Sequence, residues 1–257
     1  TANKRAGLTP HTDLGSFKRS EGAYWFENQA IGLFHSDGSI YKVTDDSGTV
    51  VNITNTGDKI SSDGRAVFAD NGTTFVACNG SKIVYSNGTA NTAFITDADA
   101  PTNVSHVAFL DQYLLCNNVG TGKFHWCDFT STPTSWSALD FTTAESNPDN
   151  LIALFVVRRT IVLFGSSSIE FYVNDGVSPF SRVNGMEIGR GIMAKHAAVN
   201  VNGILYFFDD KRRLCLLDGY RLTQLSTAFD KPIQAMSTVS DCVADFEHYD
   251  GINQIRF

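Results

Sequence analysis

The pattern of hydrophobic and polar positions repeats six times along the chain. In each repeat an apolar run ends at a polar two-residue turn, and a second apolar run follows it. Successive turns are about 44 residues apart, and a unit of that length with several short strands is typical of one blade of a β-propeller. The six turns are Asn28-Gln29, Asn71-Gly72, Asp111-Gln112, Arg158-Arg159, Asn202-Gly203 and Asp250-Gly251.

The first repeat indicates how many strands one unit contains. Residues 23–26 and 30–34 are apolar runs, and residues 39–44 alternate between polar and apolar side chains, so one face of that segment is buried. A fourth segment, residues 49–53, follows the Ser47-Gly48 turn and is less apolar than the first ones. This gradient is expected of a blade whose outermost strand faces solvent.

The sequence therefore predicts an all-β protein, a β-propeller of about six four-stranded antiparallel blades. In the third blade, residues 136–141 are the predicted outer strand. The sixth blade has only two predicted strands and is incomplete, so we expect the chain to be a fragment of a longer polypeptide. A single propeller domain is predicted over residues 1–257, with blades at 20–58, 63–98, 103–143, 149–184, 193–228 and 241–257.

Composition and the lengths of the apolar runs refine this picture in four ways. The 19 phenylalanines are expected to fill the spaces between blades. Helices should be few, because no long segment repeats apolar positions at helical spacing. The five cysteines are odd in number and never spaced C-x-x-C, which predicts reduced thiols and no disulfide framework. No apolar run approaches the length of a membrane span.

The charge of the chain argues against a surface that binds nucleic acid tightly. The formal net charge is −7, with 20 lysines and arginines, whereas affinity for phosphates comes mainly from clustered cations. Two basic runs, Arg158-Arg159 and Lys211-Arg212-Arg213, are predicted in equivalent hairpin turns of adjacent blades. Solvated turns are the simpler interpretation. The alternative is one basic ridge that contacts an acidic neighbouring protein or DNA phosphates.

Candidate sites for metals and catalysis are weak. His125 and Cys127 share a face of a strand, but no second pair of ligands follows at a spacing suited to zinc. Propeller hydrolases converge several carboxylates on one face, and the acids of this chain are scattered over turns. We therefore predict no enzyme activity, no catalytic residue, no metal and no cofactor. Glu170 and Arg190 could form a buried ion pair.

One segment carries a resemblance to a known family. It runs from Asn147 to Tyr172, and further matches lie downstream at Arg190-Gly191 and in residues 226–230. This pattern resembles the tail hub proteins of short-tailed phages, also called packaged-DNA stabilisation or tail nozzle proteins. The matching motif positions are Pro148, Asp149, Phe164, Gly165, Ser166, Ser167, Ile169, Glu170, Arg190 and Gly191.

The resemblance implies a structural role in the virion tail, for a protein made in the host cytoplasm. Members of that family form a homo-hexameric ring beneath the portal and adaptor, which extends the DNA channel and retains the packaged genome until ejection. Contact with DNA is expected to be passive. The partners implied are identical subunits, the portal or adaptor, and other tail proteins. Two other functions stay open: a glycan- or protein-binding propeller of a receptor-binding apparatus, and a propeller glycoside hydrolase.

Overall fold

The fold is built almost entirely of β-strands. The computed structural model of the chain describes residues 20–27, 29–34, 38–44, 49–60, 64–144, 149–176, 179–225, 228, 230–249 and 251–257. Within these ranges the only helix is α1, Asp230–Gln234. The expectation of few helices is confirmed.

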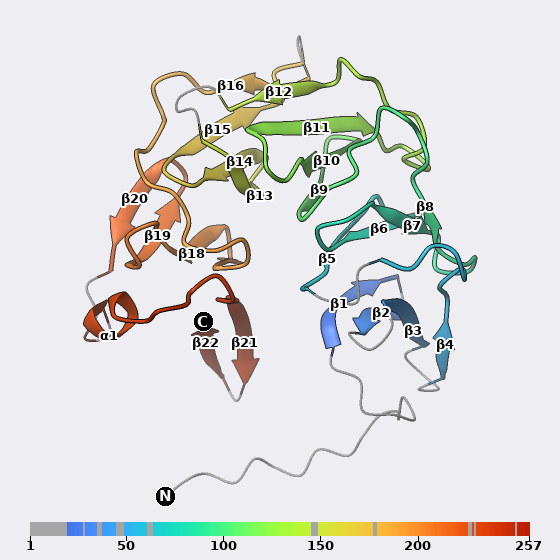
Figure 1. The fold of residues 1–257 in the computed structure, drawn as a ribbon, viewed down its shortest axis with the longest axis horizontal. Coiled ribbons are helices and arrows are strands. Elements are labelled where there is room, and N and C mark those ends of the chain that lie inside the picture. Colours follow the sequence, from blue (N-terminus) through green and yellow to red (C-terminus); the bar gives the residue numbers. More distant parts are fainter. Residues whose placement is uncertain are drawn as a thin grey trace, which may run out of the picture.

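The strands form five four-stranded antiparallel sheets and a sixth sheet of two strands. The sheets surround a common centre, with β1, β5, β9, β13 and β21 innermost, so the predicted propeller is confirmed (Figure 1). The strands are β1 Ser20–Phe26, β2 Gln29–Phe34, β3 Ser39–Thr44, β4 Val50–Asn52, β5 Val67–Asp70, β6 Phe75–Cys78, β7 Val84–Ser86, β8 Ala93–Phe94, β9 Val107–Leu110, β10 Tyr113–Asn117, β11 Lys123–Asp128, β12 Phe141–Thr143, β13 Leu151–Val157, β14 Thr160–Gly165, β15 Ile169–Val173, β16 Ser181–Arg182, β17 Ala198–Val201, β18 Ile204–Phe208, β19 Leu214–Asp218, β20 Arg221–Gln224, β21 Asp245–Tyr249 and β22 Ile252–Arg256.

The hydrophobic core lies between neighbouring blades. Four clusters of buried side chains each join two adjacent sheets. Phe26 of blade 1 meets Phe75 of blade 2 with ring centroids 5.5 Å apart, and Phe164 of blade 4 meets Phe207 of blade 5 at 4.9 Å. Each such ring stabilises the fold by about 2 kcal/mol through burial. The prediction that phenylalanines fill the spaces between blades is confirmed.

Antiparallel pairing gives the propeller two different ends. The first strand of a blade runs to one end, which we call the hairpin end, and turns there into the second strand. The turns at residues 71–72, 111–112, 158–159 and 202–203 mark this end. We call the other the crossover end; it holds the turns between second and third strands, such as residues 166–168 and 209–213.

Turns at the hairpin end require backbone conformations that most residues avoid. Both central residues have positive φ at Asp111-Gln112, Arg158-Arg159 and Asn202-Gly203. Positive φ at both positions is the signature of a type I′ turn, whose twist matches that of the flanking strands. At Arg158 and Arg159 the φ values are 47° and 66°, although arginine is not a residue that favours this region.

Two details of the predicted strands are corrected. The first hairpin turn begins one residue earlier than expected, at Glu27, because Phe26 pairs directly with Gln29. The outer strand of blade 3 is β12, so the predicted strand at residues 136–141 is wrong. Trp136 instead lies buried in the preceding loop, where its indole Nε1 donates a hydrogen bond to the Pro133 carbonyl at 3.0 Å.

Candidate functional site

The motif residues of blade 4 gather around one carboxylate at the crossover end. Asp149, just before β13, accepts hydrogen bonds from the Ser167 backbone N–H at 2.7 Å, from the Ser167 hydroxyl at 3.0 Å and from the Ser168 hydroxyl at 3.1 Å. A Cβ at Gly165 would lie 2.4 Å from a carboxylate oxygen of Asp149, so a larger residue here would displace this carboxylate from its hydrogen bonds. Pro148 lies outside the described residues.

Gly191 brings the next blade against the same turn. A Cβ on Gly191 would lie 2.2 Å from the carbonyl carbon and oxygen of Ser166. The following residue, Ile192, donates its backbone N–H to the Gly165 carbonyl at 3.1 Å. Phe164 and Ile169 are buried in the core cluster between blades 4 and 5. The structure thus brings these motif residues together, and their geometry is that of a packed joint between two blades.

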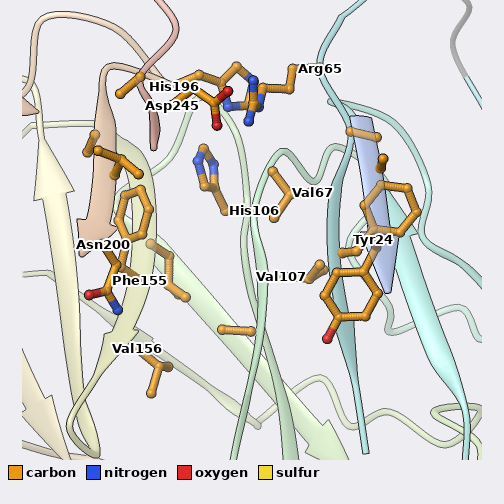
Figure 2. A pocket seen from close by; sticks show the side chains of 18 residues that line it. Tyr24, Arg65, Val67, His106, Val107, Phe155, Val156, His196, Asn200 and Asp245 are labelled. Carbon is orange, nitrogen blue, oxygen red and sulfur yellow. The ribbon is translucent and has the colours of Figure 1, made fainter. Parts of the chain in front are cut away.

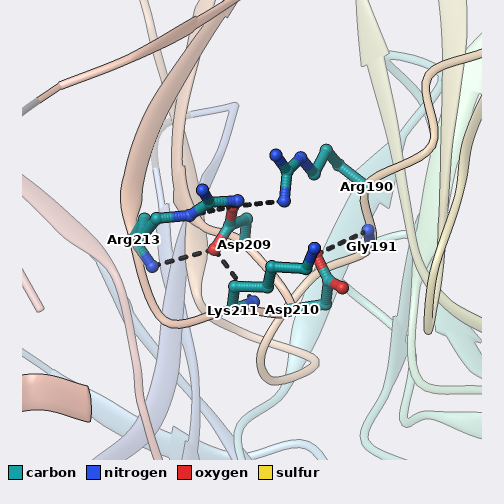
Figure 3. A network of polar contacts seen from close by, with 6 residues as sticks. All are labelled: Arg190, Gly191, Asp209, Asp210, Lys211 and Arg213. Atoms are coloured by element: carbon teal, nitrogen blue, oxygen red, sulfur yellow. Dashed lines mark hydrogen bonds and ion pairs between the residues drawn. The ribbon is translucent and has the colours of Figure 1, made fainter.

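A buried carboxylate organises the crossover end of blade 5 (Figure 3). Asp209 is fully buried and accepts hydrogen bonds from the backbone N–H groups of Lys211 at 2.9 Å and Arg213 at 2.8 Å. The guanidinium of Arg213 adds two more, from Nε at 3.0 Å and Nη2 at 2.7 Å. Arg190 Nη1 lies 3.9 Å from the same carboxylate. One carboxylate therefore interacts with two guanidinium groups and with the backbone of the turn.

The predicted ion pair between Glu170 and Arg190 is wrong. Glu170 is buried, but its carboxylate lies 3.2 Å from Nε of Arg182, which also pairs with Glu187 at 2.9 Å. The cause is strand register, because Tyr172 lies directly opposite Arg182. Glu170 is two residues from Tyr172 and shares its face of the sheet, so the long Arg182 side chain reaches it diagonally.

The two basic runs do not form one ridge, and this prediction is also corrected. Arg158-Arg159 connects the first and second strands of blade 4, whereas residues 211–213 lie in the turn between the second and third strands of blade 5. Because consecutive strands of an antiparallel sheet run in opposite directions, the two turns lie at opposite ends of the propeller. The turn of blade 5 that is equivalent to Arg158-Arg159 is Asn202-Gly203.

Most of these basic side chains already have partners within the chain. Arg158 Nη1 lies 3.0 Å from Asp218 of blade 5. Arg159 Nη1 lies 2.6 Å from Asp111 of blade 3, so this turn joins three blades. Arg212 donates to the carbonyls of Gln234 and Met236. None of these partners carries a sequence motif, which is why the pattern of residues did not indicate them.

A cavity of about 330 Å³ lies at the centre of the propeller, between the innermost strands (Figure 2). Its walls include Val67, Val107 and Phe155, and the polar residues Arg65, His196 and Asp245 meet at one end of it. Among the described residues that line the cavity, Asp245 is the single carboxylate. This lining lacks the set of converging acids that a glycoside hydrolase needs.

Two buried histidines stand at the polar end of the cavity. The His106 and His196 rings have centroids 5.2 Å apart. Burial lowers the pKa of His106 from 6.5 to about 4. For His196, burial and the neighbouring His106 lower the pKa from 6.5 to about 3. Both imidazoles are therefore neutral at pH 7. The sequence analysis did not select either residue, because single histidines in apolar segments carry no recognisable pattern.

The cysteines and the candidate metal ligands lie apart from these clusters. Within the described part of the chain, no three side chains of His, Cys, Asp or Glu gather to hold a metal ion. Cys78, Cys116, Cys127 and Cys215 are buried and carry free thiols, and Cys242 is half-buried. Burial raises the pKa of Cys127 and of Cys215 to about 12, so both thiols are protonated at neutral pH.

Repeated four-stranded sheets around one centre define the protein as a β-propeller. The family model described as "Bacteriophage P22 Gp10, beta-propeller" matches residues 3–237, and the chain belongs to this family. This membership places the protein among phage propeller proteins with a structural role, as components of the virion. Within the described residues, no helix has the length and apolar character needed to cross a membrane.

Solved structures share the fold at low sequence identity. Two structures of the extracellular domain of BT4673 from B. thetaiotaomicron, described as a hybrid two component system and as a one component system, align with TM-scores of 0.56 and 0.58. Their identities to this chain are 11% and 12%, over 89% and 92% of its length. A protein described as a 6-phosphogluconolactonase from Bacteroides uniformis aligns with a TM-score of 0.52 at 11% identity over 73% of this chain. The chain spans 30%, 32% and 62% of these proteins. No curated protein matches the sequence significantly.

Proposed function

We propose that the protein is a structural component of a phage tail hub, in which identical subunits form a ring beneath the portal and adaptor. The ring, a hexamer, extends the DNA channel and helps to retain the packaged genome until ejection. The observation that carries this proposal is the family match over residues 3–237. The motif residues around Asp149 and Gly191 fall inside the matched region.

The geometry of the blades supports a mechanical role. Buried phenylalanines and the joint between Gly165 and Gly191 tie neighbouring sheets together, and the hairpin turn at Arg158 and Arg159 links three blades. Paired strands leave few edges for unwanted association. A stiff, closely packed unit suits the wall of a channel that holds DNA under pressure.

The chemistry of the chain supports a passive wall. The net charge of −7 disfavours tight binding to phosphates, so DNA can slide past the subunit without being held. We propose that the protein is not an enzyme, since the central cavity offers one carboxylate among its described lining residues. Arg158, Arg159, Lys211, Arg212 and Arg213 remain candidates for contact with tail partners or DNA.

Genome retention tests the proposal directly. Phage particles made without this protein should package DNA and then lose it, because the channel below the portal is not closed. The measurement is the fraction of packaged DNA that becomes sensitive to nuclease, with the protein supplied from a plasmid as the control. The proposal fails if particles that lack the protein keep their DNA, or if the protein is absent from purified wild-type virions.

Binding to free DNA tests the passive character of the channel wall. The isolated chain should bind a short duplex more weakly than about 1 µM at physiological salt, because it lacks a cation excess for counterion release. Fluorescence anisotropy with a labelled duplex measures this affinity. Sub-micromolar binding would contradict a passive wall, while a role in the tail would still be decided by the genome-retention experiment.

A further inference from the structure

Among the described residues, two cations at the crossover end have no carboxylate partner: Arg65, which lines the central cavity, and Lys195, which lies near it. Arg65 lies just before β5, and Lys195 lies before β17. Neither side chain is within 4 Å of a carboxylate in the described part of the chain, although seven ion pairs formed by six other arginines are resolved there. Both residues are only partly exposed to solvent. Partly buried cations are normally paired, so this arrangement leaves a positive field over the cavity.

His196 provides a second indication of an anion site at the polar end of the cavity. Its side chain is nine-tenths buried, and its Nε2 atom has no hydrogen-bond partner among the described residues. Figure 2 shows the His196 ring beside Arg65 at the polar end of the cavity, with His106 below them. Burial lowers the pKa of His196 most, and the neighbouring His106, Lys195 and Arg65 lower it further. A buried polar atom without a partner is costly, and an anion placed here would satisfy it.

Most of the other residues that line the cavity are apolar, with Tyr24 and Asn200 as polar exceptions. Val67, Val107 and Phe155 line it below the polar end, in the view of Figure 2. The volume of about 330 Å³ is at the lower limit of small-molecule pockets and suits a group the size of an aromatic ring with one charged substituent. Asp245 is the one opposing charge at the rim, and it is exposed.

We infer that the central cavity binds a small molecule with an anionic group, a phosphate or a carboxylate, on an apolar body. The anion lies between the Arg65 guanidinium and Nε2 of His196, which donates to it. Lys195 does not line the cavity, but its ammonium lies close to Gly64, next to Arg65, and its charge adds to the attraction. The apolar body occupies the space lined by Val107 and Phe155. This inference concerns the interior of a single propeller and does not depend on the proposed role in the tail.

Calorimetry with the whole 257-residue chain tests the inference, using phenyl phosphate and inorganic phosphate as probes. Phenyl phosphate should bind at one site and at least about tenfold more tightly than inorganic phosphate, because only the former buries apolar surface in the cavity. Arg65→Gln should weaken phenyl phosphate binding about tenfold or more, since a charge-assisted hydrogen bond is lost. Asp245→Asn should strengthen binding severalfold by removing the opposing charge.

A matched control separates a built site from general attraction. Lys82 lies outside the cavity, with its ammonium near the Phe94 ring, and Lys82→Gln changes the net charge as much as Arg65→Gln does. It should leave the affinity unchanged. Circular dichroism verifies that each variant is folded. If Arg65→Gln does not fold, Arg65→Lys and Asp245→Asn provide the same comparison with smaller changes.

Three results would overturn the inference. The first is no saturable binding of either probe up to about 10 mM, the range of very weak ligands. The second is equal weakening by Arg65→Gln and Lys82→Gln, which would mean that net charge alone attracts the anion. The third is equal affinity for phenyl phosphate and inorganic phosphate, which would mean that the apolar part of the cavity takes no part in binding.

Discussion

The two ends of the propeller use the same ionic groups in different surroundings. At the crossover end, Arg213 pairs with Asp209, whose side chain is 1% exposed. At the hairpin end, Arg158 pairs with Asp218 while their side chains are 59% and 52% exposed. A pair in water contributes little, but a buried carboxylate that loses its donors is strongly destabilising. Breaking the buried ion pair at the crossover end should therefore cost more stability than breaking one at the hairpin end, where exposed charges can change partners at little cost.

The largest expected effect is at the buried carboxylate. Asp209→Asn keeps the size of the side chain but removes the charge that holds Arg213 and Arg190, and it should cost about 3–5 kcal/mol of unfolding free energy. Urea denaturation measures the loss. The matched control is Asp218→Asn at the hairpin end, which should cost less than about 1 kcal/mol. Equal losses at the two sites would remove the distinction between the ends.

A further loss of stability is expected at low pH, through the two buried histidines at the crossover end. His106 and His196 are neutral in the folded protein, with pKa values of about 4 and about 3, against 6.5 when unfolded. The unfolded chain therefore binds more protons below pH 6.5, so stability is complete above that pH and falls as the pH drops toward 4. The loss between pH 7 and pH 4 should be on the order of 3 kcal/mol for each of the two histidines.

Urea denaturation at several pH values measures this slope. His106→Gln with His196→Gln should flatten it between pH 6.5 and 4, because both neutral imidazoles are removed. The control is His248→Gln in β21, since that residue is exposed. A wild-type stability that stays constant from pH 7 to pH 4 would show that the two histidines do not couple folding to protonation.

A smaller effect is expected from one methyl group between blades 4 and 5. Gly191→Ala places a carbon where the Ser166 carbonyl lies 2.2 Å away, so the backbone must shift, at a cost of about 1–3 kcal/mol. Gly189→Ala is the matched control, because a Cβ at Gly189 meets nothing within 4 Å. Thermal unfolding should separate the two variants clearly. Similar melting temperatures would mean that the joint between these blades is loose.

The smallest effect is expected at the hairpin end. Replacing Arg158-Arg159 by Asn-Gly removes two exposed ion pairs but supplies residues that favour the positive φ of this turn. The loss of the ion pairs and the gain of favourable turn residues act in opposite directions, so the unfolding free energy should stay within about 1 kcal/mol of the wild type. Chemical denaturation checks this. A larger loss would mean that the two arginines hold three blades together more strongly than exposed ion pairs can.

Sequence periodicity predicted the repeat, the four-stranded blades and the phenylalanine core, because short-range alternation and turn residues act locally. The resemblance to a known family pointed to Asp149, Gly165 and Gly191, but it did not show that these residues lie close together. The sequence analysis failed for Glu170 and Arg190, since their partners depend on strand register. It failed again for Trp136, whose indole hydrogen bond and burial outweigh the alternating pattern of residues 136–141.

The sequence by itself determined that the chain folds into blades, because each hairpin depends on residues that are neighbours along the chain. Only the tertiary structure decided which charges meet. Arg158 finds Asp218 and Arg159 finds Asp111 across blade boundaries, and the central cavity collects Arg65, His106 and His196 from three different blades. These contacts join residues tens of positions apart. Their positions follow from how the sheets are arranged around the centre, which no local pattern of residues encodes.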